Sequence, residues 1–156
     1  MLFQRINRSD PEKIFIVAKN SYSTASLTNG QPVEWDYLTD ADGVGVTKPA
    51  AVAVTGGFAM AGIAAETIAA GSYGLIQVYG YHSAVLVRTM STTGNGARGW
   101  IAVAAGTPLT GPLAAEFCLE GVATGSAKFI SYPCAFALAA QAVYTITATA
   151  CFIKAL

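Results

Sequence analysis

Hydrophobic and polar positions alternate with a period of two along much of this chain, which is the pattern of β-strands. Over 31–38, Val33, Trp35 and Tyr37 fall on one face of a predicted strand, and Glu34 and Asp36 fall on the other. From 145 to 150, threonine alternates with isoleucine or alanine. Strands that are buried on one face of an antiparallel sheet show this alternation.

The stretch 57–88 has few ionisable side chains, and the rest of the prediction is built around it. Its only charged or histidine side chains are Glu66, His82 and Arg88. A β-branched and aromatic run at 75–79 predicts a strand, a glycine at 71 suits a turn with positive φ, and Gly80 suits a bend. We expect the order strand, turn, strand, kink, strand.

Part of this stretch also carries a helical pattern. Apolar or small residues at 60, 63, 64, 67 and 68 have helical spacing. The glycines at 57, 62 and 71 interrupt that helix, and no capping box opens it. We therefore favour a strand over 59–70, with a helix as the alternative, and for 112–120 the pattern does not distinguish helix from strand.

Further strands are predicted from Lys13 to Lys19, over 44–47 and 100–105, and in the last thirty residues on either side of Pro133. The resulting fold class is mainly β. We expect a single compact antiparallel β-sandwich or barrel-like domain over 13–156, preceded by an N-terminal arm over 1–12 that is too polar to form a core element.

The composition narrows the class of partner. The chain has 156 residues, a formal net charge of zero and only 12% charged residues, against about 25% in a typical protein. A surface with so little charge indicates a homo-oligomer or another protein partner. Neutrality disfavours nucleic-acid binding, which needs clustered Lys and Arg.

The sequence does not favour a membrane protein. Phe129 to Ile153 has no charged residue, but Pro133, Gln141 and the alternating threonines make it strand-like rather than a membrane helix. The N-terminus lacks the apolar core of a signal peptide, so we expect assembly in the cytoplasm.

Candidate catalytic chemistry is sparse. His82, the sole histidine, lies between Tyr81 and Ser83 beside the predicted kink, where an interface residue is expected rather than a general base. No GxSxG elbow and no GxxxxGK[ST] loop occurs. We therefore expect no enzymatic activity.

Neither cysteine nor carboxylate spacing predicts a metal or cofactor site. Cys118, Cys134 and Cys151 are widely separated in apolar sequence and are expected to be buried thiols. Asp36, Asp40 and Asp42, followed by Gly43, lack the alternating ligands and the terminal glutamate of a calcium loop, so we expect a solvated hairpin turn there. We predict no metal and no cofactor.

Several segments together resemble the capsid decoration, or cement, proteins of tailed bacteriophages, a class of small virion structural proteins. The segments are Asp10–Lys13, Asn29–Asp36, Asp42–Val44, Thr47–Pro49, Ala61–Ala64, Gly74–Gly80 and Phe152–Leu156. The resemblance spans nearly the whole chain and rests on turns and strand patterns. It implies a β-rich protein that docks on the outer surface of a virion, often as a trimer, and clamps adjacent copies of the major capsid protein.

Two groups of residues are candidates for those contacts. Arg5 and Arg8 in the arm are expected to contact the capsid. Trp35, Tyr79 and Tyr81, with His82, are expected at subunit contacts, because Trp, Tyr and Arg dominate interface hot spots. Core packing is the alternative for each aromatic residue. The alternative function is a carbohydrate- or receptor-binding module of a phage tail or fibre.

Overall fold

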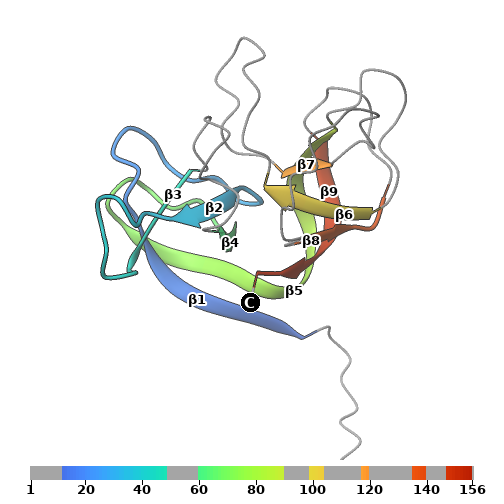
Figure 1. The fold of residues 1–156 in the computed structure, drawn as a ribbon, viewed down its shortest axis with the longest axis horizontal. Helices are drawn as coiled ribbons and strands as arrows, with labels where there is room; N and C mark the ends of the chain where they lie inside the picture. Colours follow the sequence, from blue (N-terminus) through green and yellow to red (C-terminus); the bar gives the residue numbers. More distant parts are fainter. Residues whose placement is uncertain are drawn as a thin grey trace, which may run out of the picture.

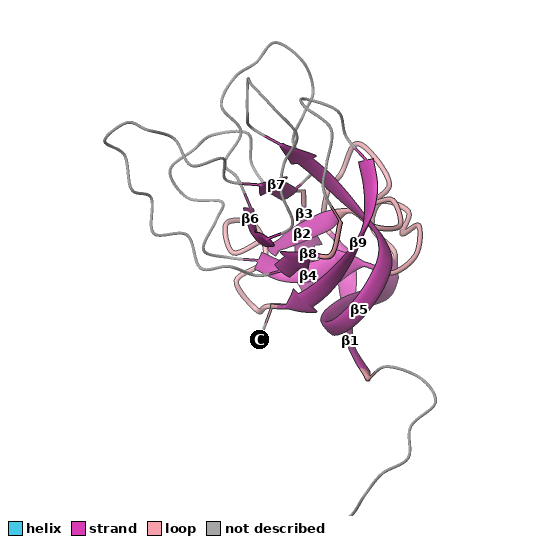
Figure 2. Ribbon diagram, turned by 90° about the vertical axis from the view of Figure 1, so that its right-hand side faces the viewer, coloured by secondary structure: helices cyan, strands magenta, loops and turns pink. Residues whose placement is uncertain are grey.

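The computed structural model describes residues 12–48, 60–89, 99–103, 117–119, 135–139 and 147–155, and these residues are mainly β. They contain strands and loops without a helix (Figure 2). The strands are β1 Lys13–Asn20, β2 Pro32–Trp35, β3 Gly45–Thr47, β4 Met60–Ala64, β5 Tyr73–Thr89, β6 Gly99–Val103, β7 Phe117–Leu119, β8 Ala135–Ala137 and β9 Thr147–Lys154. Within these ranges, accordingly, there is no apolar helix of the length needed to cross a membrane. The predicted β class is confirmed.

All nine strands join one sheet, and β5 lies at its centre (Figure 1). The hydrogen-bonded order is β1-β3-β2-β4-β5-β7-β6-β8-β9, and β5 also pairs with both β1 and β9. These two extra pairings close the order into two rings. The first ring contains β1 to β5, the second ring contains β5 to β9, and β5 belongs to both.

Strand direction differs from the prediction of an antiparallel fold. Most pairs are antiparallel, but β1 and β3 are parallel, and so are β5 and β7. The sheet is therefore mixed. Alternation along one strand reports which face is buried and carries no information about the direction of the neighbouring strand, so the sequence pattern could not reveal the two parallel pairs.

The predicted kink in β5 is confirmed. Ile14 lies opposite Tyr79 and Phe15 lies opposite Gln77, so β5 carries one extra residue, Val78, against β1. Gly80 follows with φ of +99°. A second irregularity lies between His82 and Val85 against β9. Bulges bend and twist a strand, which lets one 17-residue strand serve two rings.

The helical alternative for 59–70 is wrong. Residues 60–64 form β4, and a turn then leads to β5, with Gly71 at φ of +75° as predicted. The Glu66 carboxylate accepts a hydrogen bond from the Leu75 N–H at 2.9 Å, which holds the turn against β5. Ile63 in β4 and Ile68, which forms an isolated β-bridge with Leu27, are both buried, and this produces the helix-like spacing. Of the segment 112–120, residues 117–119 are strand, and the other residues lie outside the described part of the chain.

Two clusters of buried side chains fill the two rings. The first core consists of Ala18, Leu27, Val33, Val46, Ala61, Ala64, Ile68 and Ile76. The second core consists of Ile63, Val85, Val87, Ala135, Ala137, Cys151 and Ile153. Ile63 belongs to β4 of the first ring but packs in the second core, so side-chain packing as well as β5 connects the two rings.

The strand predicted over 31–38 is shorter, and its faces are less distinct than expected. β2 ends at Trp35, and Tyr37 lies beyond it with nearly half of its surface exposed. Glu34, predicted on the outer face, is buried, and the pairing of β2 with β4 shifts its register between Val33 and Glu34, which interrupts the simple alternation of faces. The alternation of apolar and acidic residues over 31–38 therefore matches the observed buried and exposed faces only in part.

Cys151 is a buried free thiol, as predicted for this cysteine. Cys134 and the side chain of Cys118 lie outside the described residues. Burial raises the pKa of the Cys151 thiol from 9.0 to about 12. Because the thiolate is the nucleophile, alkylation of Cys151 at about pH 8 is expected to be roughly a thousandfold slower than in denaturant. Peptide mass spectrometry after timed alkylation checks this, and equal rates in both conditions would contradict it.

Candidate docking surface

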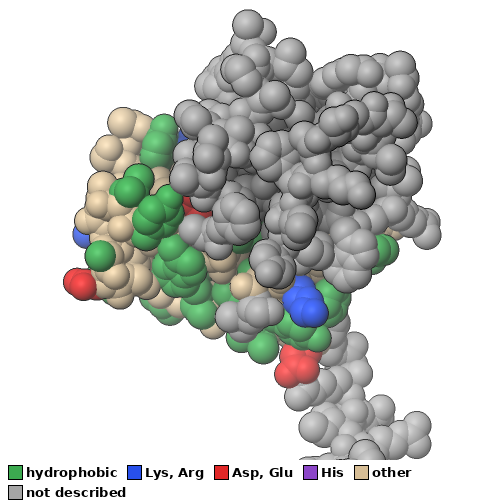
Figure 3. All heavy atoms as spheres, viewed as in Figure 1, with side chains coloured by type: hydrophobic (Ala, Val, Ile, Leu, Met, Phe, Trp, Pro, Cys, Tyr) green, Lys and Arg blue, Asp and Glu red, His purple; other side chains and the backbone are tan. Residues whose placement is uncertain are grey.

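Four large hydrophobic side chains are exposed on neighbouring positions of β1 and β5. Val17 and Leu75 lie directly opposite each other in the ladder, and they are 66% and 42% exposed. Phe15 and Tyr73 extend the group along the same two strands, at 41% and 62% exposure. We call these four residues the β1 face. Hydrophobic side chains form a band across the described part of the molecular surface in Figure 3.

Lysines border the β1 face at both ends. Lys19 lies opposite Tyr73, and Lys13 lies opposite Gly80. An exposed apolar group with a charged border is typical of a protein-binding surface. The strand pattern contained a signal for this face, because Phe15 and Val17 are apolar while Ile14, Ile16 and Ala18 on the other face are apolar too. A strand at the outside of a ring can bury only one such face.

The aromatic residues predicted at subunit contacts are only partly exposed to solvent. Tyr79 is half-buried and packs edge-on against Phe152, with ring centroids 5.2 Å apart. Tyr81 is also half-buried, and its carbonyl accepts a hydrogen bond from Gln77. Trp35 packs against the first core. Core packing, which the sequence left as the alternative, is therefore seen for Trp35, while Tyr79 and Tyr81 are half-buried and belong to neither core. Sequence reasoning missed the β1 face.

His82 is buried within the fold. Its side chain is 8% exposed, and its Nδ1 accepts a hydrogen bond from the Ala84 N–H at 3.1 Å. Burial, and secondarily the positive charge of Lys13, lower the pKa of His82 below its ordinary value of 6.5. An imidazole in this position stabilises the bulge in β5 as a neutral acceptor. Arg5 and Arg8, the predicted capsid contacts, lie outside the described residues.

The lowered pKa of His82 predicts a pH dependence of stability. Below about pH 6.5 the unfolded state binds a proton that the folded state does not, so the free energy of unfolding is expected to decrease as the pH falls through and below that value. Replacing His82 by asparagine keeps an acceptor for Ala84 and removes the titration. Denaturant unfolding of both proteins at about pH 8 and about pH 5.5 checks this. An equal loss in both proteins would rule out His82 as its source.

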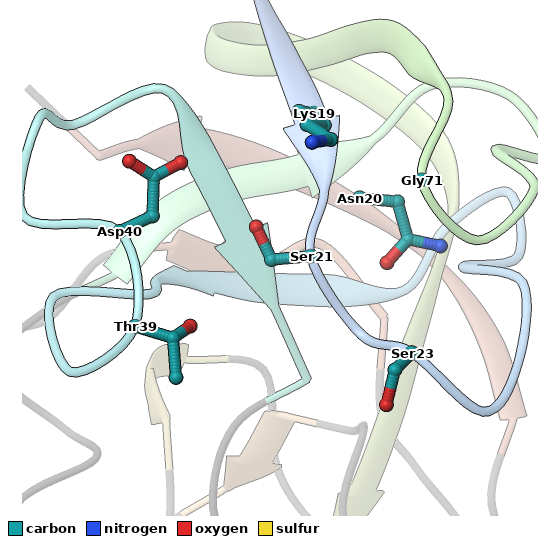
Figure 4. Close-up of a pocket in the computed structure, with 7 residues that line it drawn as sticks. All are labelled: Lys19, Asn20, Ser21, Ser23, Thr39, Asp40 and Gly71. Atoms are coloured by element: carbon teal, nitrogen blue, oxygen red, sulfur yellow. The ribbon is translucent and has the colours of Figure 1, made fainter.

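A separate, polar pocket lies at the end of β1 (Figure 4). Its volume is about 430 Å³, and its lining comes from the end of β1, the following loop, the loop after β2 and the turn before β5. The lining residues are Lys19, Asn20, Ser21, Ser23, Thr39, Asp40 and Gly71. Hydroxyl, carboxylate and ammonium groups therefore share one solvent-open hollow.

Asn20 holds the walls of this pocket together. Its Nδ2 donates to the Ile68 carbonyl at 2.9 Å and to the Ala25 carbonyl at 3.2 Å, and its Oδ1 accepts from the Tyr22 N–H. All of its polar atoms are engaged, so Asn20 is structural. Among the described residues, no group of three His, Cys, Asp or Glu side chains is placed to hold a metal ion.

Comparison with known proteins adds no assignment to this geometry: no protein-family model matches the sequence, and no curated protein matches it.

Proposed function

We propose that this chain is a non-enzymatic structural protein of a phage virion that decorates the outer surface of the capsid and stabilises it by clamping adjacent capsomers. The observation that carries the proposal is the β1 face, an exposed apolar surface on a chain with few charges. Such a surface is expected to be covered when the protein performs its function. The resemblance of the turn and strand segments to decoration proteins supports the choice of partner.

The proposed architecture is a single barrel-like domain over 13–156 with an N-terminal arm over 1–12. The closure of each ring through β5 supports the barrel-like description, because closure removes most open strand edges. The arm would contact the major capsid protein through Arg5 and Arg8. The folded domain would contact neighbouring subunits, so that the virion carries a homo-oligomer, assembled in the host cytoplasm.

The energetics of such docking favour many weak contacts. Apolar burial contributes about 25 cal/mol per Å², but association costs offset much of it at any one contact. An oligomer that engages several capsomers binds with an effective concentration set by the lattice, so avidity supplies the missing affinity. Neither a bound cofactor nor a reactive group is required for this role.

Removal of the arm tests the proposal. Deletion of residues 1–9 is expected to abolish binding of the purified protein to particles that lack it, while the unfolding midpoint stays unchanged. Tyr73→Lys on the β1 face is the second variant, and Leu38→Lys is its control, because Leu38 is exposed in the loop after β2 and belongs to neither strand of that face. Sedimentation of particles with bound protein measures occupancy. Normal occupancy by the truncated protein would remove the arm from the proposal.

The polar pocket supports a second candidate, a carbohydrate-binding module of a tail or fibre. Tyr73 is exposed and lies opposite Lys19, which lines the pocket. An exposed aromatic ring beside hydroxyl and carboxylate groups suits stacking and hydrogen bonding to a sugar. A glycan array separates the candidates: binding that is lost in Asp40→Ala favours the module, and capsid binding without any glycan signal favours the decoration protein.

A further inference from the structure

One strand edge in the first ring has no partner among the described residues. β3 pairs with β1 only at Lys19 and Asn20, so the ring closes through the last two residues of β1. The rest of β1 pairs with β5 on one side. Figure 1 shows β1 as the outermost strand, with its free side facing away from the sheet.

Two backbone hydrogen bonds of β1 determine which of its backbone groups point to that free side. The Asn20 N–H donates to the Ser72 carbonyl, on the β5 side, and the Lys19 N–H donates to the Val44 carbonyl, on the opposite side. Successive residues of a strand alternate between its two neighbours. The N–H and C=O groups of Lys13, Phe15 and Val17 therefore point away from β5.

This edge is suited to receive another strand. The extra residue of the bulge, Val78, lies in β5, so β1 itself keeps a regular alternation from Lys13 to Lys19. Proteins usually protect open edges with proline, inward-pointing charges or a bulge, and β1 shows none of these between its terminal lysines. An unprotected edge with exposed apolar residues is a template for strand addition.

We infer that two copies of this chain pair through their β1 strands, antiparallel and edge to edge, across a two-fold axis at Phe15, so that the homo-oligomer is a dimer and not the trimer that the resemblance implies. The second copy supplies the same free edge, so each copy satisfies the other. In this register Phe15 lies opposite Phe15 of the second copy, and Lys13 lies opposite its Val17. The pairing forms about six hydrogen bonds between the two backbones.

Neighbouring registers are less favourable. A two-fold axis at Ile16 would place Lys13 opposite Lys19 of the second copy, where like charges repel and the Lys19 N–H already bonds to Val44. With an axis at Ile14, Val17 would lie beyond the first residue of the facing β1 strand and would have no partner in that strand. Each alternative loses about two of the hydrogen bonds. Charge and hydrogen bonding therefore select the register at Phe15.

The selected register also gives the apolar side chains on both faces of β1 apolar neighbours from the second copy. On one face, Phe15 and Val17 of the two copies join into a continuous group with Leu75 and Tyr73. On the other face, Ile14, which is 41% exposed, lies opposite Ile16 of the second copy. β-branched and aromatic pairs across strands stabilise such pairing. The paired β1 strands give a sheet that continues from one copy into the other.

Charge exchange at Phe15 tests the inference with the full chain. Analytical ultracentrifugation of the wild-type protein is expected to show a dimer. Phe15→Lys and Phe15→Glu are each expected to be monomers, because each places like charges together at the axis. An equimolar mixture of the two variants is expected to recover the dimer, since Lys then faces Glu. Leu38→Lys is the charge control and should remain a dimer.

The outcomes separate the pairing from the decoration function. A wild-type monomer or trimer, a Phe15→Lys dimer, or a mixture that stays monomeric would each overturn the pairing through β1. Circular dichroism identifies a variant that fails to fold, and Val17→Pro then replaces it, since this proline removes an N–H that points away from β5 and should leave a folded monomer. Occupancy of capsid particles by the wild-type protein tests the decoration function independently.

Discussion

Replacing Gly80 by alanine is expected to destabilise the protein by about 3 kcal/mol or more. Gly80 has φ of +99°, a conformation that residues with a Cβ rarely adopt. A Cβ at this position would lie 2.0 Å from the carbonyl oxygen of Glu12. That oxygen belongs to the backbone, so the contact cannot be relieved by a side-chain rotation. The strand β5 would have to move away from β1 at its bend.

Gly71 provides the matched control for this substitution. Its φ is +75°, but a Cβ there would meet no atom within 4 Å. Gly71→Ala therefore introduces backbone strain without the clash and is expected to cost about 1 to 2 kcal/mol. Denaturant unfolding of both variants measures the difference. Equal losses would show that β1 and β5 do not approach as closely at Gly80 as the structure indicates.

Replacing Ile153 by alanine is expected to cost about 2 to 5 kcal/mol, the range for removing a large aliphatic side chain from a core. Ile153 is fully buried in the second core. It lies in β9, opposite Gly80 of β5 and Ala135 of β8. Those small neighbours leave little side-chain volume that could move into the cavity. Leu38→Ala, at a residue that is 82% exposed, is expected to change stability by less than about 0.5 kcal/mol.

Ile153→Ala also tests whether the two rings unfold together. β5 runs through both rings, and Ile63 of the first ring packs in the second core. Ile153→Ala should therefore increase the hydrogen exchange of first-ring amides, such as that of Ile76, as well as those of the second ring. Faster exchange confined to the second ring would mean that the rings are separate cooperative units.

Local features of the fold were predictable where the physical cause lies in a few adjacent residues. Gly71 and Gly80 mark the turn and the bend because only glycine tolerates their φ values without strain. The β-branched run before Gly80 gives a strand. The strands that pair with β5 were not predictable, because pairing between segments that are distant in the sequence produces no pattern within either segment. The two parallel pairs, β1 with β3 and β5 with β7, are examples of such long-range pairing.

The candidate surface was less predictable than the strands. Aromatic type suggested Trp35, Tyr79 and Tyr81 as contacts, but side-chain type does not report which face of a strand lies outward. Their half-burial depends on β2, β5 and β9 meeting other strands. Conversely, Phe15 and Val17 are exposed although they are apolar, because β1 is the outermost strand of its ring. Surface position is a property of the whole topology.

The position of the protein on a virus particle tests the proposed function most directly. Particles purified from cells that make this chain can be analysed by quantitative mass spectrometry, after labelling of exposed lysines on intact particles. The proposed function predicts the chain at a fixed ratio to the major capsid protein, with at least one of its lysines labelled from outside. A chain that is absent from the particles and found only in the soluble fraction would contradict the proposal.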